Sequence, residues 1–154
     1  MEKAIDLEKL SIDLDWKEFE VLAEKVFASF GYSTIRNLRL KKPRMEIDLV
    51  ASKGNFSFAA DCKHWKRTAG NASMTRIGEK QASRAKRISE DGLHKKVMPM
   101  ILTMRDESLF VLENGVPVVP IHRLSDFILN WEESPVEITL FERNTVQETL
   151  SRSC

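Results

Sequence analysis

Two aspartates and a lysine have the spacing of a metal-assisted hydrolytic site. Asp61 and Lys63 lie two positions apart in an apolar run that begins at Phe56, and Asp48 precedes a turn at residues 52–55. Alternate side chains of a strand share a face, so Asp61 and Lys63 face the same space. A hairpin around the Gly-Asn turn would bring Asp48 close to them. Two carboxylates beside an ammonium can hold a hard divalent cation and align a water next to it.

The same spacing also fits a simpler arrangement. Asp61 and Lys63 could form an ordinary ion pair on the surface of a sheet, without any chemistry. Asp48 on the facing strand and the segregated charge of the chain favour the catalytic interpretation. Glu20 adds to it only if a helix carries it to the same place.

Apolar periodicity predicts a helix on each side of this hairpin in the sequence. The first has capping-box spacing at Asp15 and Glu18 and ends before Gly31, with Glu20 on the border of its apolar stripe. The second spans residues 74–89, with a cap at Asn71 or Ser73, and carries Gln81 within its buried stripe. Residues 32–40 are expected to form a strand and residues 41–44 a basic turn.

The remaining pattern predicts an α/β fold with a mixed β-sheet flanked by helices, whose core order is αβββαβ. Further expected elements are a buried strand at 96–104, a hairpin of 109–112 and 116–121 whose prolines indicate an edge strand, a helix at 124–131 and a strand at 136–141. We expect a single domain over residues 1–154, with a core at about 15–105, a C-terminal hairpin, helix and strand at 106–142, and a tail at 143–154.

Composition indicates a cytoplasmic protein that does not enter a membrane. Hydrophobic residues make up 42% and charged residues 31% of the sequence, and no apolar run has the roughly 18 residues of a membrane span. The N-terminus has no signal-peptide pattern, and the two cysteines do not suggest a disulfide framework.

The net charge of +1 hides a strong segregation of charge. Residues 31–96 contain sixteen lysines and arginines against six acidic residues, whereas residues 1–24 contain eight acidic residues against three lysines. This asymmetry favours a polyanion-binding face over a merely solvated surface. The basic residues predicted to contact nucleic acid are Arg36, Arg39, Lys41, Lys42, Arg44, Lys66, Arg67, Arg76, Lys80, Arg84 and Arg87.

Four segments in order resemble a known enzyme superfamily. They are Trp16-Lys-Glu-Phe-Glu20, Phe30-Gly-Tyr32, Glu46-Ile-Asp-Leu-Val-Ala51 and Asp61-Cys-Lys-His-Trp65. Together with the expected element order they resemble the PD-(D/E)xK nucleases, in particular the Mrr-like restriction endonuclease branch, and are similar to archaeal Holliday junction resolvases. The chain departs from the signature in having Glu46-Ile47, with no proline, before Asp48.

The resemblance implies a Mg²⁺-dependent DNA endonuclease, with Mn²⁺ able to substitute. It assigns Asp48, Asp61, the backbone carbonyl of Cys62 and Glu20 to the metal. It assigns Lys63 to the attacking water and places Gln81 near the site. It also implies DNA as partner, a homodimer, and a separate subunit as one source of sequence recognition.

Two other functions stay open at this point. The first is a nucleic-acid-binding module that keeps the fold but does not cleave, although clustered carboxylates would repel phosphate unless a cation intervenes. The second is an interaction domain that docks through its acidic ends. Duplex, branched, modified and single-stranded DNA all remain candidate substrates.

Overall fold

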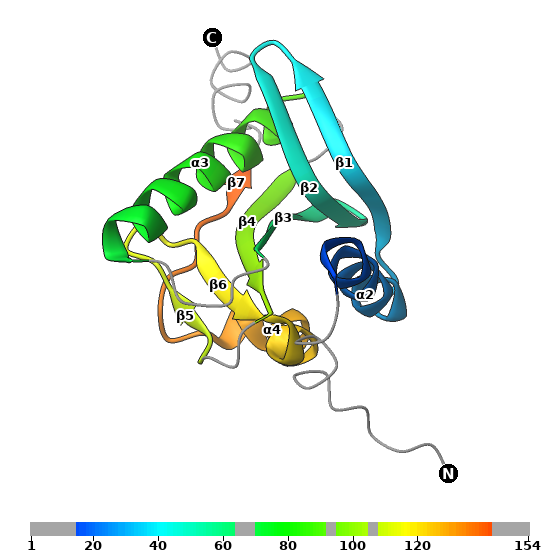
Figure 1. Cartoon of the computed structure of the whole chain (residues 1–154), viewed down its shortest axis with the longest axis vertical. Coiled ribbons are helices and arrows are strands. Elements are labelled where there is room, and N and C mark those ends of the chain that lie inside the picture. The colour runs from blue at the N-terminus through cyan, green and yellow to red at the C-terminus, as the bar shows by residue number, and fades with distance from the viewer. Residues whose placement is uncertain (1–14, 64–69, 92–94, 105–107, 143–154) are drawn as a thin grey trace, which may run out of the picture.

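The computed structural model describes residues 15–63, 70–91, 95–104 and 108–142. Within these ranges helices pack against both faces of a mixed sheet (Figure 1). The elements in order are α2 (Trp16–Ser29), β1 (Ser33–Lys41), β2 (Arg44–Lys53), β3 (Phe56–Lys63), α3 (Asn71–Ser89), β4 (Lys96–Thr103), β5 (Phe110–Val111), β6 (Pro117–Pro120), η1 (Ile121–Arg123), α4 (Leu124–Asn130), η2 (Trp131–Glu133) and β7 (Phe141–Glu142).

The sheet combines an antiparallel meander with parallel strands. Its order is β1-β2-β3-β4-β6-β5, and β7 pairs with β4. Strands β1, β2 and β3 are antiparallel neighbours, whereas α3 carries the chain across so that β4 runs parallel to β3. This arrangement confirms the predicted α/β class with its mixed sheet and αβββαβ core.

One face of the sheet packs against α2 and α4 through aromatic side chains. Phe27 of α2 and Phe127 of α4 both contact the ring of Phe58, which is fully buried in β3. The apolar face of α2 arises from the helical spacing of its phenylalanines, and Asp15 Oδ1 caps the helix by accepting from Glu18 N at 2.8 Å. This layer fixes β3, the strand that carries Asp61 and Lys63.

The other face packs against α3. Val50 and Ala59 of the sheet form a buried cluster with Ala85 and Ile88 of the helix. The helix begins at Asn71 with Gly70 as its N-cap and no side-chain cap, so the predicted capping by Asn71 or Ser73 was wrong. The chain reaches the helix through residues that the structure does not describe, which include Lys66 and Arg67.

Two predictions in the C-terminal region were also wrong. The proline-containing strand β6 is not an edge strand, because it lies between β4 and β5. Each of its prolines pairs at an end of the strand, where a missing amide donor interrupts the ladder least. The predicted strand at 136–141 shrinks to β7, Phe141–Glu142, because Thr139 N and Oγ1 bond to carbonyls of the turn at Asn114 and Gly115 instead.

No helix in the described part of the chain is both long enough and apolar enough to span a membrane.

We predict that Phe58→Ala lowers the free energy of unfolding by about 3–5 kcal/mol, the usual cost of removing a fully buried phenylalanine. The ring contacts Phe27, Tyr32, Phe56 and Phe127, so the cavity would lie where both helices meet the sheet. Urea unfolding measures the change. Ile35→Ala, on the exposed edge strand, is the control and should cost less than about 1 kcal/mol; equal costs would contradict this packing.

Candidate active site

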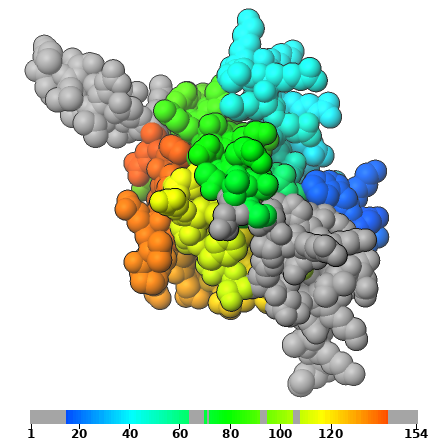
Figure 2. Space-filling view, turned by 60° about the vertical axis from the view of Figure 1, so that its left-hand side comes forward, coloured from blue at the N-terminus to red at the C-terminus, as the bar shows by residue number. Residues whose placement is uncertain are grey.

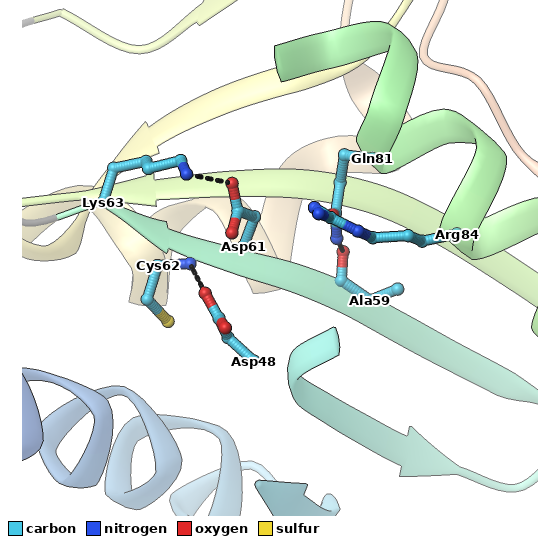
Figure 3. Close-up of polar contacts among 7 residues, drawn as sticks. All are labelled: Asp48, Ala59, Asp61, Cys62, Lys63, Gln81 and Arg84. Atoms are coloured by element: carbon cyan, nitrogen blue, oxygen red, sulfur yellow. Dashed lines mark hydrogen bonds and ion pairs between the residues drawn. The ribbon is translucent and has the colours of Figure 1, made fainter. Parts of the chain in front are cut away.

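The candidate site lies where strands β2 and β3 separate. Their ladder runs from Lys53–Phe56 to Leu49–Ala60 and does not extend to Asp48 and Asp61, the next facing positions. The side chain of Asp48 bridges the gap instead, because its Oδ2 accepts a hydrogen bond from the backbone N–H of Cys62 at 2.9 Å (Figure 3). At this fork, where β2 and β3 separate, the side chain of Asp48 therefore reaches across to the backbone of the neighbouring strand.

Asp48 and Asp61 come together at this fork. Their carboxyl groups lie within hydrogen-bonding distance of each other, and the charge of Glu20 acts on Asp48 as well. Burial, the hydrogen bond to Asp61 and repulsion from Asp61 and Glu20 raise the pKa of Asp48 to about 7, against the lowering effect of the Cys62 amide. Burial and the same carboxylates also raise the pKa of the Cys62 thiol, which stays protonated and unreactive.

Among the described residues, Lys63 supplies the cation in contact with Asp61. Its Nζ lies 3.1 Å from Asp61 Oδ2, and its side chain is 30% exposed while that of Asp61 is 8% exposed. The pair differs from an ordinary surface ion pair because the carboxylate is buried and faces a second carboxylate. The Lys63 side chain remains partly open to solvent.

Glu20 reaches the same region from α2. Its side chain is buried, with 3% exposure, and its Oε2 has no hydrogen-bond partner in the described part of the chain. Burial raises the pKa of Glu20, whereas the charge of Arg36 and a hydrogen bond from Trp16 lower it. An unpartnered buried carboxylate oxygen is costly unless something that is positively charged satisfies it.

Gln81 has a different place from the aspartates. It is fully buried on α3, where its Nε2 donates to the carbonyl of Ala59 at 2.7 Å and its Oε1 accepts from Arg84 Nη1 at 3.1 Å (Figure 3). The amide thus attaches α3 to β3 two residues before Asp61. These contacts make Gln81 a support for the strand, and Arg84 in turn supports Gln81.

The predicted nucleic-acid contacts fall into two groups. Four arginines already make contacts within the chain: Arg36 with Glu24 at 3.6 Å, Arg39 with Glu46 at 3.8 Å, Arg84 with Gln81, and Arg87 Nε with the carbonyl of Lys42 at 3.2 Å. The others are exposed in the described ranges, namely Lys41, Lys42, Arg44, Arg76 and Lys80. Lys66 and Arg67 lie outside those ranges.

The residues present fit a hard divalent cation. No group of three or more His, Cys, Asp or Glu side chains within the described ranges is placed to hold a metal ion by itself. Nevertheless, Glu20 Oε2 is buried there without a hydrogen-bond partner, and the Asp48 and Asp61 carboxyl groups crowd each other. Mg²⁺ suits such a site because it is bound by one or two carboxylates and keeps several waters. The backbone carbonyl of Cys62 would be the further oxygen ligand.

Sequence reasoning missed the residues that act on this site from a distance. Trp16, the first residue of α2, hydrogen bonds to Glu20. Arg84 holds Gln81, although its place in a basic row suggested a surface contact. The i, i+3 spacing of Gln81 and Arg84 on one helix was a usable signal, since such residues are neighbours; Trp16 gave none.

We predict that Asp48→Asn stabilises the metal-free protein at high pH. An unfolded aspartate titrates near ~3.9, so a folded-state pKa of about 7 means that the folded protein binds an extra proton between these values. The stability that this provides is complete below about pH 4 and is lost as pH rises through about 7. Asparagine keeps an acceptor for Cys62 N–H but carries no charge.

Chemical denaturation in EDTA should therefore show equal stability of wild type and Asp48→Asn at pH 4. At pH 8 the variant should be more stable by about 1–2 kcal/mol, less than the full shift implies because solvent screens part of it. Asp126→Asn, at an exposed aspartate of α4, is the control and should show no such pH dependence. A constant difference between pH 4 and pH 8 for Asp48→Asn would contradict the carboxylate crowding.

Comparison with known proteins agrees with this geometry. A family model described as a restriction endonuclease, the Mrr catalytic domain, matches residues 12–89, which include Glu20, Asp48, Asp61, Lys63 and Gln81. No curated protein matched the sequence.

Two solved structures are similar to the chain. The small subunit of the heterodimeric restriction endonuclease R.BspD6I has 15% identity and a TM-score of 0.50, over 96% of this chain and 87% of that one. The protein of unknown function AF1548 has 17% identity and a TM-score of 0.40, over 64% of this chain and 47% of that one, so this chain spans about half its length. The match over half of the sequence and the shared fold lead to one conclusion: the chain belongs to the Mrr-like restriction endonuclease catalytic domains of the PD-(D/E)xK nuclease fold.

Proposed function

We propose that this protein is a metal-dependent endonuclease that hydrolyses phosphodiester bonds in DNA. Its family is one of nuclease domains. The observation that carries the proposal is the crowding of the Asp48 and Asp61 carboxyls at the fork, with Lys63 Nζ 3.1 Å from Asp61. A protein that only bound DNA would gain nothing from two adjacent carboxylates facing a polyanion.

Mg²⁺, with Mn²⁺ able to replace it, would neutralise the charge that develops on the nonbridging phosphate oxygens and acidify a bound water. Asp48, Asp61 and the carbonyl of Cys62 would hold this cation, and Glu20 on α2 would orient the water bound to it. Cys62 N–H keeps Asp48 Oδ2 pointing into the gap. Lys63 Nζ would orient the attacking water, and its positive charge would favour loss of that water's proton to bulk solvent.

The DNA-binding surface includes the tip of the β1–β2 hairpin. Lys41, Lys42 and Arg44 are exposed there, and Figure 2 shows the hairpin, in cyan, standing out above α3, in green. Arg87 donates a hydrogen bond to the carbonyl of Lys42, and this contact holds the backbone of the turn that carries the exposed cations. Arg76 and Lys80 extend the basic surface along α3. These residues would contact phosphates on either side of the cleaved bond.

Cutting both strands of a duplex needs two active sites or two turnovers. We propose that the protein works in the cytoplasm as a homodimer or with a separate recognition subunit, since a solved structure of similar fold is a subunit of a heterodimeric enzyme. The C-terminal hairpin and α4 are the proposed contact region. There the apolar side chain of Leu129 is 65% exposed, so a second subunit could cover it.

Lys63→Met should lower the rate of DNA cleavage by at least about 100-fold, because it removes the cation that orients and activates the attacking water but keeps the side-chain length. Cleavage of labelled linear, branched and single-stranded DNA is measured with Mg²⁺, with Mn²⁺ and with EDTA. The control is Lys96→Met, the same substitution at the opposite end of the parallel β3–β4 pair, where the side chain is 51% exposed.

Metal-independent cleavage, or equal cleavage by wild type and Lys63→Met, would refute the catalytic assignment. Salt-sensitive binding without cleavage of any substrate would instead favour a non-cleaving binding module on the same fold.

Replacing Lys41, Lys42 and Arg44 together by glutamine should weaken DNA binding about equally for all sequences. It should also reduce the slope of log K against log salt by about 2–3, since each lost phosphate contact contributes roughly 0.9. Fluorescence anisotropy in EDTA measures both quantities without cleavage. The control replaces three other exposed lysines, Lys17, Lys25 and Lys96, by glutamine, which changes the net charge by the same amount. Equal slopes for the two triple variants would exclude the hairpin tip from the DNA-binding surface.

A further inference from the structure

The β1–β2 ladder is interrupted at one position. Arg36 pairs with Leu49 and Leu38 pairs with Ile47, but Asn37 and Asp48 between them do not pair. The register is the same on both sides of the gap, so no residue is inserted and the interruption is a local change of backbone direction. Asn37 has a φ of 55°, the left-handed region, and is the only non-glycine residue with positive φ in the described ranges.

Asp48 therefore lies between two interruptions. On one side its facing position is Asn37, and on the other it is Asp61, where the β2–β3 ladder has ended. A continuous strand would hold Asp48 in the regular alternation of faces and present its side chain perpendicular to the sheet. Instead the carboxylate lies in the gap, on Cys62 N and close to Asp61.

The side chain of Asn37 does not explain this conformation. It is exposed, and it makes no hydrogen bond with any residue that the structure describes. Asparagine enters the left-handed region several-fold more readily than most residues, whereas a β-branched residue there is an outlier. An unusual backbone angle beside functional groups is a reason to look for a role in holding them.

We infer that Asn37 is a positioning residue for Asp48. Its left-handed backbone interrupts the ladder across from Asp48, and this frees the strand to turn the carboxylate toward Cys62 N and Asp61. The role belongs to the backbone angle, so glycine can take it over and residues that resist positive φ cannot. The consequence for a metal rests on the proposed function, whereas the consequence for the Cys62 amide does not.

The test compares Asn37→Gly, Asn37→Ala and Asn37→Val. The first readout is hydrogen exchange of the Cys62 amide, measured by NMR on the metal-free protein relative to the Phe58 amide in the regular part of β3. Global destabilisation would speed exchange of both amides, whereas a misplaced Asp48 would speed that of Cys62 alone. Asp48→Ala, which removes the acceptor, sets the scale, and Ser33→Val, at an exposed position of β1, is the matched control.

The second readout is Mg²⁺ affinity by calorimetry without DNA. We expect Asn37→Gly and Ser33→Val to match wild type within about twofold. Asn37→Ala and Asn37→Val should bind Mg²⁺ about 10–100-fold more weakly, the usual loss when the support of a metal ligand is removed. Their Cys62 amide should exchange about as fast as in Asp48→Ala.

Asn37→Gly behaving like Asn37→Val would overturn the inference, because the side chain and not the backbone would then matter. Wild-type exchange at Cys62 in Asn37→Ala would overturn it too, and this milder variant decides the matter if Asn37→Val does not fold. Failure of wild type to bind Mg²⁺ would refute the proposed function alone, since the exchange of the Cys62 amide still tests the placement of Asp48.

Discussion

Crowding of buried carboxyl groups is the constraint on which the site depends. Asp48 and Asp61 lie within hydrogen-bonding distance, and Glu20 adds a third carboxylate whose Oε2 is buried without a partner in the described part of the chain. A charged group in such surroundings is unfavourable unless it is paired. Lys63 compensates one carboxylate, and the Cys62 amide partly compensates another. The negative charge that stays uncompensated is the reason to propose a divalent cation at this site. It is also the reason why the metal-free protein is expected to hold a proton on Asp48 near neutral pH.

The fold meets this constraint by opening its sheet. Because β2 and β3 separate after Leu49 and Ala60, a side chain from β2, an amide from β3 and a glutamate from α2 can converge. The helices α2 and α3 cover opposite faces of the sheet. The rest of the sheet stays tightly packed around the opening. Phe58 lies on one face of β3 and Gln81 fixes its other side through the carbonyl of Ala59, so the strand that bears Asp61 and Lys63 has little freedom. Tight packing beside the interrupted ladder therefore holds the crowded carboxyl groups in place, although their proximity is unfavourable.

The sequence allowed the fold class, the hairpin and the approach of Asp61 to Lys63 to be predicted, because strand alternation and the Gly54-Asn55 turn are local signals. It also indicated that Gln81 is buried, from helical spacing. It could not indicate that Gln81 would bind the carbonyl of Ala59, since this contact depends on how α3 sits on the sheet. The predicted edge position of β6 was wrong for the same reason. Proline indicates an interrupted ladder, but only tertiary structure decides whether another strand lies beyond it. The left-handed Asn37 gave no local signal of its own.

The position of β4 has a consequence for where this nuclease domain can be divided. The family match ends at residue 89, yet Lys96–Thr103 forms the strand that lies next to β3, and all of it except Lys96 is buried. A polypeptide trimmed to the matched segment would carry every proposed catalytic side chain and still leave β3 with an open, apolar edge beside Phe58, which invites aggregation. The smallest portion of the chain that can be expressed on its own is therefore larger than the segment that matches the family model.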